Sequence, residues 1–212
     1  MFTFFTAPNT CSLAVHIALE EAGAQYEISR VDTSANAQRT PAYLAINPKG
    51  RVPTLVTPHG VLTETPALLA FVAQSFPAAG LAPLDDPYAF ARIQSFNSYL
   101  CSTVHVAHAH KHRAYRWVDA NDTAAIEAMR ARVPQTMADC FELIEREMFT
   151  GPWVMGDTYS IADAYLFTIA NWLEGDGVDP ARFPKVLGHR HRMLARPAVA
   201  RAVAQAAPTW TA

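Results

Sequence analysis

The first third of the chain alternates between short runs suited to β-strands and longer helical patterns. Residues 2–6 form a strand-prone run, and a helical pattern that begins at Cys11 ends at Gly23, a residue suited to a left-handed helix cap. Residues 26–31 alternate apolar and polar positions, which is the pattern of a second strand. This β-α-β order predicts two parallel strands joined by a right-handed crossover.

A hairpin and another helix are predicted to follow. After a short helical piece, residues 54–57 and 61–63 are brief strands about a turn that contains proline and glycine. Thr65 is expected to cap the next helix, with Pro66 at its first position. This helix is predicted to run to about Phe76, where a proline follows.

Strand patterns disappear from the rest of the chain. Residues 80–86 are the expected linker between an α/β domain at residues 1–79 and an all-helical domain at residues 87–212. The predicted helices of the second domain cover residues 88–115, 123–149, 160–172 and 182–206. The fold class is therefore α/β plus all-α.

Composition narrows the class of protein. The chain of 212 residues is 50% hydrophobic and 17% charged, which allows a sizeable core and excludes general disorder. Its net charge of −2 offers no electrostatic reason to bind nucleic acid or an anionic membrane, so neither is expected as a partner. No apolar run is long enough to cross a bilayer, and the first residues are expected to form a strand and not a signal peptide.

The cysteines indicate a compartment. Cys11, Cys101 and Cys140 stand far apart, and the sequence has no C-x-x-C pair. An odd and sparse set of this kind is typical of a reducing compartment and not of a disulfide framework. The expected location is therefore the cytoplasm.

Four segments resemble one known family, in order and at the expected spacing. They are Ala7-Pro-Asn-Thr-Cys-Ser-Leu-Ala, Asn47-Pro-Lys-Gly-Arg-Val-Pro-Thr-Leu, Leu62-Thr-Glu-Thr-Pro-Ala-Leu and Trp153-Val-Met-Gly-Asp-Thr-Tyr-Ser-Ile-Ala-Asp. The first three are similar to the glutathione-site segments of bacterial beta-class glutathione S-transferases. The fourth resembles the helix-capping motif of that family, so the resemblance covers most of the chain.

This resemblance implies a fold and an activity. The fold is a thioredoxin-like amino-terminal domain followed by an all-helical domain that carries the electrophile pocket. The activity is conjugation of the glutathione thiolate to a hydrophobic electrophile, with glutathione as co-substrate and no metal. Because the family forms homodimers, a homodimer is also expected.

Cys11 and Ser12 begin the first predicted helix. The unpaired amides and the dipole of a helix start favour an anion, which predicts a lowered pKa for the Cys11 thiol. By resemblance, Cys11 lies beside the glutathione sulfur and Ser12 is a candidate donor to its thiolate. A buried thiol and a simple helix cap are the structural alternatives. Ala14 takes the place of a second cysteine, which excludes a dithiol cycle within this helix.

Two further segments are expected to hold glutathione. By resemblance, the Val52–Pro53 peptide is cis and turns the backbone of Val52 outward, where the tripeptide pairs with it like an added strand. Thr65 offers a hydroxyl and a free amide at a helix start to the γ-glutamyl carboxylate, although capping alone would also explain it. Glu64 is expected to accept a hydrogen bond from the ammonium group of the ligand.

A stretch of the helical domain resembles the family's wall opposite the thiol. Ser102 and His105 in this stretch are candidate glutathione contacts, with His105 near the sulfur. Val106 follows where the family usually has a lysine, and Asn36 stands about where another lysine reaches glutathione. The lost charges predict weaker glutathione binding and a more apolar mouth to the electrophile pocket.

Several histidines fall in the same stretch. His105, His108 and His112 share a helix face at spacings of three and four residues, as a metal site could use. No carboxylate or cysteine completes the set, so a polar helix face is the preferred interpretation and no metal is assigned.

One motif near residue 160 has a structural interpretation. Ser160 followed by Asp163 is a capping box, which should fix a buried helix of the second domain. Tyr165 and Trp172 on that helix are assigned to the core and not to the site.

The chemistry that follows glutathione binding stays open. Conjugation is the leading hypothesis. A thiol reductase or peroxidase that works through a Cys11–glutathione mixed disulfide is the main alternative. A non-catalytic protein that binds glutathione or an apolar ligand, and an isomerase or dehalogenase, use the same fold, so the fold does not choose among these functions.

Overall fold

The computed structural model describes residues 1–206 and begins with a four-stranded sheet. Its strands are β1 (Phe2–Thr6), β2 (Tyr26–Arg30), β3 (Thr54–Thr57) and β4 (Gly60–Thr63), in the order β2-β1-β3-β4. β1 and β2 are parallel, whereas β1–β3 and β3–β4 are antiparallel. The predicted β-α-β unit and hairpin are therefore confirmed.

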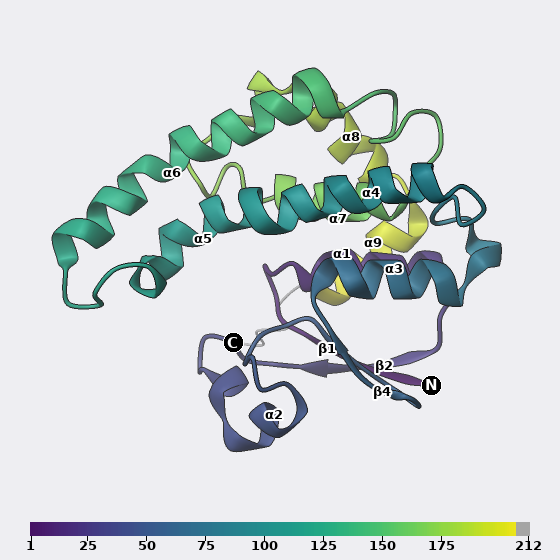
Figure 1. Cartoon of the computed structure of the whole chain (residues 1–212), viewed down its shortest axis with the longest axis horizontal. Coiled ribbons are helices and arrows are strands. Elements are labelled where there is room, and N and C mark those ends of the chain that lie inside the picture. The colour runs from purple at the N-terminus through teal and green to yellow at the C-terminus, as the bar shows by residue number, and fades with distance from the viewer. Residues whose placement is uncertain (207–212) are drawn as a thin grey trace.

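The helices of the first half surround this sheet. They are α1 (Ser12–Glu21), α2 (Pro41–Ile46) and α3 (Thr65–Ser75). α1 and α3 lie between the sheet and the helices of the second half, and α2 lies on the other side of the sheet (Figure 1). Gly23 has a φ of 62°, as expected for a left-handed residue after α1. In this arrangement the start of α1, at Cys11, lies next to the helices of the second half of the chain.

The start of α3 differs from the prediction by one residue. Glu64 takes the position before the helix, with a φ of 74° and no capping side-chain hydrogen bond, and Thr65 is the first helical residue. The prediction that Thr65 caps this helix was therefore wrong. The physical reason is that the chain turns from β4 into the helix at Glu64, so the amide of Thr65 already belongs to the unpaired first turn.

The second half is helical. Its helices are α4 (Pro87–Tyr99), α5 (His105–Arg113), α6 (Thr123–Leu143), α7 (Ile161–Ala170), α8 (Pro184–Leu194) and α9 (Pro197–Ala206), with π-helical turns η3 (Leu100–Val104) and η5 (Ile144–Met148). Short 3-10 turns are η1 (Ala37–Arg39), η2 (Pro77–Ala79), η4 (Ala114–Arg116) and η6 (Pro180–Arg182). The single helix predicted for residues 182–206 was wrong, because Pro197 has no N–H to donate and begins a new helix. None of the helices described has the length and apolar character needed to span a membrane.

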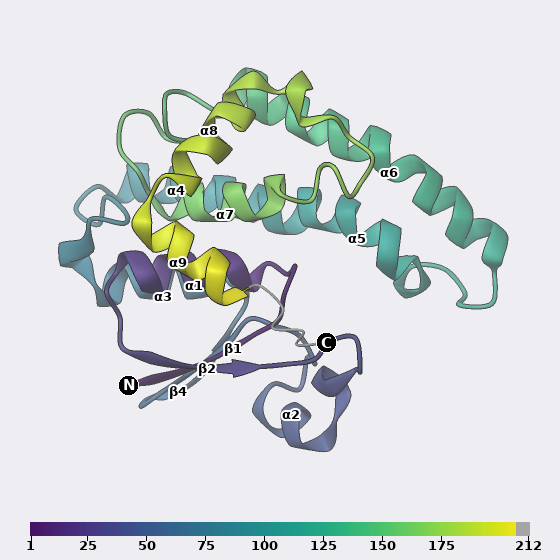
Figure 2. The same ribbon diagram turned by 180° about the vertical axis from the view of Figure 1, so that it is seen from behind.

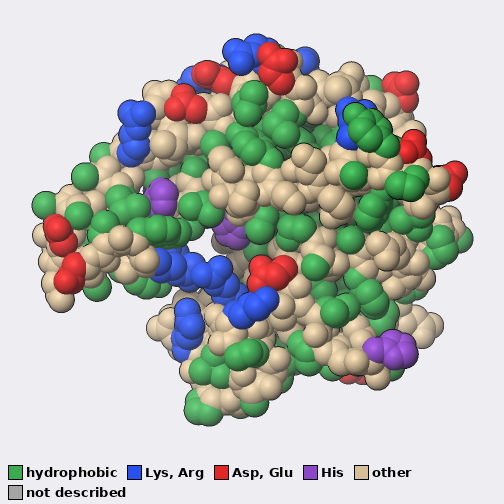
Figure 3. Space-filling model, viewed as in Figure 1, with side chains coloured by type: hydrophobic (Ala, Val, Ile, Leu, Met, Phe, Trp, Pro, Cys, Tyr) green, Lys and Arg blue, Asp and Glu red, His purple; other side chains and the backbone are tan. Residues whose placement is uncertain are grey.

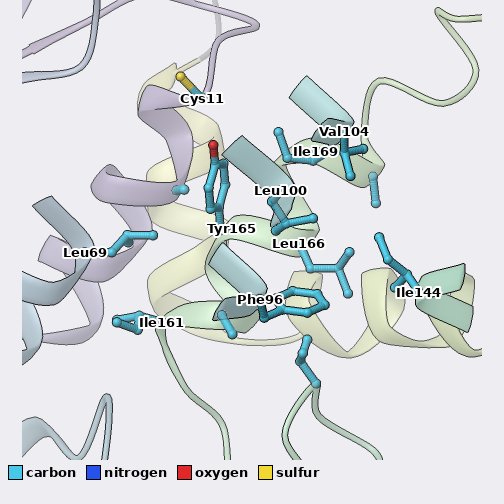
Figure 4. Packing of buried hydrophobic residues seen from close by; sticks show 14 of the residues in the cluster. Cys11, Leu69, Phe96, Leu100, Val104, Ile144, Ile161, Tyr165, Leu166 and Ile169 are labelled. Carbon is cyan, nitrogen blue, oxygen red and sulfur yellow. The ribbon is translucent and has the colours of Figure 1, made fainter. Parts of the chain in front are cut away.

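Helix α7 forms the centre of the second half. All of its residues from Ile161 to Ala170 are buried, and it packs against α1, α4 and α8. Figure 4 shows Leu166 and Ile169 of α7 packed beside Phe96 and Leu100. Because α7 also touches α1, it connects the core of the helical half to the element that carries Cys11.

The last helix ties the two halves together. α9 packs along α1, as Figure 2 shows from behind. Just before α9, the guanidinium of Arg196 donates to both carboxylate oxygens of Glu21, at 2.6 and 2.9 Å. Arg201 donates to Glu20 at 2.7 Å. These ion pairs hold α1 against α9, which lies beside it.

Candidate functional site

A cleft between the two halves of the chain contains most of the residues singled out in the sequence. Cys11, Arg51, Val52, His105, Ala109 and Arg116 line both of its sides. One side, called here the Thr65 side, adds Glu64, Thr65, Cys101, Trp117 and Tyr165. The other, called here the Trp172 side, adds His108, His112, Arg113, Arg130 and Trp172.

Cys11 sits at the position before α1, where the sequence placed it. Its side chain is only 8% exposed, and Sγ donates to the carbonyl oxygen of Val52 at 3.7 Å. The Val52–Pro53 peptide is cis, as the resemblance implied. The structure therefore brings the thiol and the backbone of Val52 together.

The expected lowering of the Cys11 pKa was wrong. Burial raises the pKa of the Cys11 thiol to about 11, although a hydrogen bond from Thr65 acts in the opposite direction. The physical reason is that a thiolate in this covered position loses its hydration, and the helix start does not compensate for that loss. Cys11 is therefore a neutral thiol at neutral pH.

This raised pKa predicts slow alkylation of Cys11. Because the pKa rises from 9.0 to about 11, the thiolate fraction at pH 8 is about 100-fold lower than for an ordinary cysteine. Haloacetamide modification should therefore be slow at pH 8 and accelerate with pH up to about 11. The rate is measured by mass spectrometry in a Cys101→Ser/Cys140→Ser variant, where Cys11 is the remaining thiol. A rate that is already constant above pH 8 would contradict the raised pKa.

Ser12 does not reach the cleft. It is fully buried, with its hydroxyl 2.7 Å from the hydroxyl of Thr6 and 2.6 Å from that of Thr10. It also donates to the carbonyl of Ala7 at 3.2 Å. These bonds tie the loop between β1 and α1 to the sheet, so the structure contradicts the idea that the Ser12 hydroxyl is free to act on a thiolate.

Thr65 and Glu64 line the Thr65 side, as expected. Thr65 is buried, and its hydroxyl lies close enough to Cys11 to influence the pKa of that thiol. Glu64 accepts a hydrogen bond from Lys49 Nζ at 2.6 Å, and the same ammonium reaches Thr63 at 2.9 Å. The start of α3 thus presents a backbone anion site together with one cation and one carboxylate.

His105 faces Cys11 across the cleft, as the sequence implied. Burial first, and then the charges of His108 and the nearby arginines, lower the pKa of His105 to about 4. It is therefore neutral at physiological pH. Its ring centroid lies 5.0 Å from that of Trp172.

Two other candidates lie away from the cleft. Ser102 is exposed and donates to the carbonyl of Ser98 at 2.8 Å, because η3 turns it away from the thiol. Asn36 is exposed in a left-handed turn, with a φ of 57°. The structure thus does not bring either residue to the site, and the short side chain of Asn36 could not span the gap that a lysine would.

Tyr165 and Cys101 were missed as residues of the site. Figure 4 shows the Tyr165 hydroxyl pointing toward Cys11 from α7. This hydroxyl is buried and has no hydrogen bond of good geometry. Burial first, and then the nearby Cys11 and Cys101, raise the pKa of Tyr165. A tyrosine within a buried apolar helix looks like core in the sequence, and only its unsatisfied hydroxyl reveals the other role.

Trp172 was also assigned to the core, and it is buried there, but it lines the cleft as well. The ring of His108 stacks on it, with centroids 4.1 Å apart and planes at 20°. His108 Nδ1 lies 2.7 Å from Oδ2 of the buried Asp176, a carboxylate that the sequence pattern did not associate with the histidines. Within residues 1–206, no group of three histidine, cysteine or carboxylate side chains is arranged to hold a metal ion.

Comparison with known proteins decides the family. The family model described as "Glutathione S-transferase, N-terminal domain" matches residues 1–74, and the one described as "Glutathione S-transferase, C-terminal domain" matches residues 124–192. A glutathione S-transferase of Escherichia coli is 30% identical over 92% of this chain and 94% of its own length. The chain belongs to the glutathione S-transferase family.

Solved structures of glutathione S-transferases share the complete fold. A glutathione transferase homologue from Sulfitobacter, with bound glutathione, is 48% identical, with a TM-score of 0.93, and the match covers 97% of this chain and 98% of that one. A sphingomonad glutathione S-transferase complexed with glutathione is 32% identical, with a TM-score of 0.82 and coverage of 96% and 98%. The predicted thioredoxin-like domain followed by a helical domain is thereby confirmed.

Proposed function

We propose that this cleft binds glutathione and transfers its sulfur to the carbon of an electrophile. The observation that carries the proposal is the convergence of the Cys11 thiol, the backbone of Val52 and the start of α3 at Thr65 on one cleft. These groups come from three separate segments of the chain, so their meeting is a property of the fold. The glutathione bound in the Sulfitobacter and sphingomonad structures supports the same ligand here.

Each part of glutathione has a matching group on the protein. The γ-glutamyl carboxylate is placed at the amides of the first turn of α3, beside the hydroxyl of Thr65. Its ammonium group pairs with Glu64, which Lys49 contacts at 2.6 Å. The cysteinyl backbone pairs with Val52, next to Pro53, in the manner of an added strand. The glutathione sulfur then lies beside Cys11.

The chemistry requires a glutathione thiolate. Its thiol proton leaves to solvent, the sulfur lone pair forms a C–S bond, and the electrophile releases its leaving group with the bonding electrons. Because Cys11 stays protonated, its S–H can donate weakly to the thiolate, and the hydroxyl of Tyr165 behind it is a further donor. His105 is neutral and acts as part of the opposite wall.

A second function is favoured by one observation. Cys11 and Cys101 line the same side of the cleft, which suits thiol exchange. In that reaction the Cys11 thiolate attacks the glutathionyl sulfur of a mixed disulfide between glutathione and another thiol, and that other thiol leaves as its thiolate. A glutathione thiolate then attacks the Cys11–glutathione disulfide, which forms oxidised glutathione and restores the Cys11 thiolate. The raised pKa of Cys11 disfavours this route, since the thiolate is the attacking species.

The two functions are separated by comparing wild type with Cys11→Ala. Conjugation of a chromogenic aryl halide should stay within about tenfold of wild type, because the removed thiol is only a weak donor. Reduction of a mixed disulfide of glutathione should be lost if it occurs in wild type. Calorimetric titration with S-methylglutathione tests binding independently of either reaction. Loss of conjugation together with unchanged binding would show that Cys11 itself carries the chemistry.

Three further features belong to the same proposal. We place the division between the domains at residues 80–86, between η2 and α4. The protein is expected to act as a homodimer, as the resemblance to the family implies, and to lie in the cytoplasm, as its odd and sparse set of cysteines indicates. Sedimentation of the purified protein measures the oligomeric state, and a monomer at micromolar concentration would contradict the dimer.

A further inference from the structure

The Trp172 side of the cleft is rich in arginine. Arg51, Arg113, Arg116 and Arg130 line it, and no aspartate or glutamate of the described chain does. Figure 3 shows lysine and arginine side chains along the rim of the hollow between the two halves, with acidic side chains beside some of them and histidine inside. This local charge contrasts with the net charge of −2 of the whole chain. Val106, from which a more apolar mouth was predicted, lines the Thr65 side instead, so these arginines add charge at a different part of the cleft.

Three of these four arginines have no ion pair among residues 1–206. Arg130 is neutralised by Glu127 at 2.6 Å. In contrast, no ion pair of Arg51, Arg113 or Arg116 exists in that part of the chain. Burial and the charge of Arg51 lower the pKa of Arg116, so the two guanidinium groups repel each other across the cleft. An anion placed between them would relieve that repulsion.

Glutathione can satisfy only part of this charge. Its γ-glutamyl carboxylate is assigned to the start of α3, on the Thr65 side. Arg51 directly precedes Val52, so it is within reach of the glycyl carboxylate of a tripeptide that lies along Val52. Arg116, on η4, and Arg113, at the end of α5, stand on the opposite wall and remain for another anion.

The rest of this side suits a planar body. Trp172 is only 9% exposed, with His108 stacked on its indole at 4.1 Å and His105 next to it at 5.0 Å, so the three rings together form one aromatic wall. Asp176 is held by His108 and does not line the cleft, so it does not neutralise the arginines. A ligand with a flat apolar body and an anionic end would therefore match both the aromatic wall and the cations.

We propose that the electrophile carries a carboxylate, which Arg116 and Arg113 bind while its planar body lies beside the aromatic wall of His105, His108 and Trp172. Guanidinium groups bind carboxylates with paired hydrogen bonds, which a neutral substrate cannot form. This inference rests on the proposed function and makes it more specific, since it replaces a merely hydrophobic electrophile by an anionic one. The arginines orient the acceptor, and the sulfur chemistry stays at Cys11.

Two matched conjugates test the inference by binding alone. They are S-(para-carboxybenzyl)glutathione and its neutral amide, S-(para-carbamoylbenzyl)glutathione, titrated calorimetrically into the full chain. Wild type should bind the carboxylate at least about tenfold more tightly than the amide at low salt. The preference should shrink in about 0.5 M salt, because the charges lie at an open cleft.

Two variants test whether Arg113 and Arg116 cause the preference for the carboxylate conjugate. In Arg113→Gln/Arg116→Gln the preference should fall to about twofold or less, while S-methylglutathione binds as in wild type. Arg132→Gln, on the exposed face of α6 and outside the cleft, is the matched control and should retain the preference. A chloronitrobenzoate and its amide should show the same order in kcat/KM.

The outcomes that would overturn the inference are distinct from failure of the proposed function. Equal affinities for the two conjugates in wild type would exclude a carboxylate site. An equal loss of S-methylglutathione binding in the arginine variant would show that these residues serve glutathione instead. If wild type does not bind S-methylglutathione at all, the proposed function itself fails, and the inference fails with it.

Discussion

Replacing Asp163 with alanine is expected to lower the free energy of unfolding by about 3–5 kcal/mol. The carboxylate of Asp163 is fully buried and accepts from the backbone amides of Val154 at 2.8 Å and Ser160 at 2.7 Å. It also lies 3.0 Å from Nε2 of His189. Alanine would leave these buried groups without a partner at the start of α7. The loss in the free energy of unfolding therefore exceeds the loss expected when only a helix-capping side chain is removed.

Urea unfolding followed by circular dichroism measures this effect. Asp157→Ala is the matched control, because Asp157 is exposed in the same loop, and it should change stability by less than about 0.5 kcal/mol. Asp163→Asn keeps one carbonyl acceptor, so its loss in the free energy of unfolding should lie between those of Asp163→Ala and Asp157→Ala. A loss below about 1 kcal/mol for Asp163→Ala would show that the loop relaxes and water replaces the carboxylate.

Tyr165→Phe is expected to reduce conjugation by roughly 10- to 100-fold without loss of stability. The Tyr165 hydroxyl is buried and lacks a hydrogen-bond partner of good geometry, so its removal should leave the free energy of unfolding unchanged or slightly higher. Because it points toward Cys11 at the bottom of the cleft, it is placed to donate toward the thiolate when glutathione is bound. A side chain kept for function and not for stability shows this combination, in which its removal lowers activity and leaves stability unchanged or higher.

The measurement compares kcat and KM for glutathione with thermal unfolding of the same samples. Tyr99→Phe is the control, since the hydroxyl of Tyr99 lies beside Cys140 and outside the cleft. It should change neither kinetic constant. Destabilisation of Tyr165→Phe with normal activity would assign Tyr165 to the core alone, as the sequence pattern suggested.

The elements of the fold were predictable because their causes are local. The alternation at residues 26–31, the cap at Gly23 and the capping box from Ser160 to Asp163 each act within a few residues, and all three are present in the structure. Errors occurred where two local tendencies compete. The break at Pro197 was hidden by a continuing helical pattern on both sides, and the start of α3 was displaced by the turn at Glu64.

The site was only partly predictable. Cys11, Val52, Thr65 and His105 were found because each stands in a motif or resembles one. The roles of Ser12 and Asn36 were not, because a side chain's direction and exposure depend on its packing partners. Ser12 is bonded to Thr6 and Thr10, so its hydroxyl is used within the sheet and loop.

The sequence by itself determined the order of strands and helices and the family, and it singled out the segments proposed to bind glutathione, because short-range patterns and motifs encode them. Only the tertiary structure decided the charge state of Cys11 and gathered the arginines on one side of the cleft. The pKa of a thiol depends on how completely other elements exclude water from it. The pairing of His108 with Asp176 and the facing of Arg51 by Arg116 join residues 68 and 65 positions apart. Such contacts arise when helices pack, and no local pattern records them.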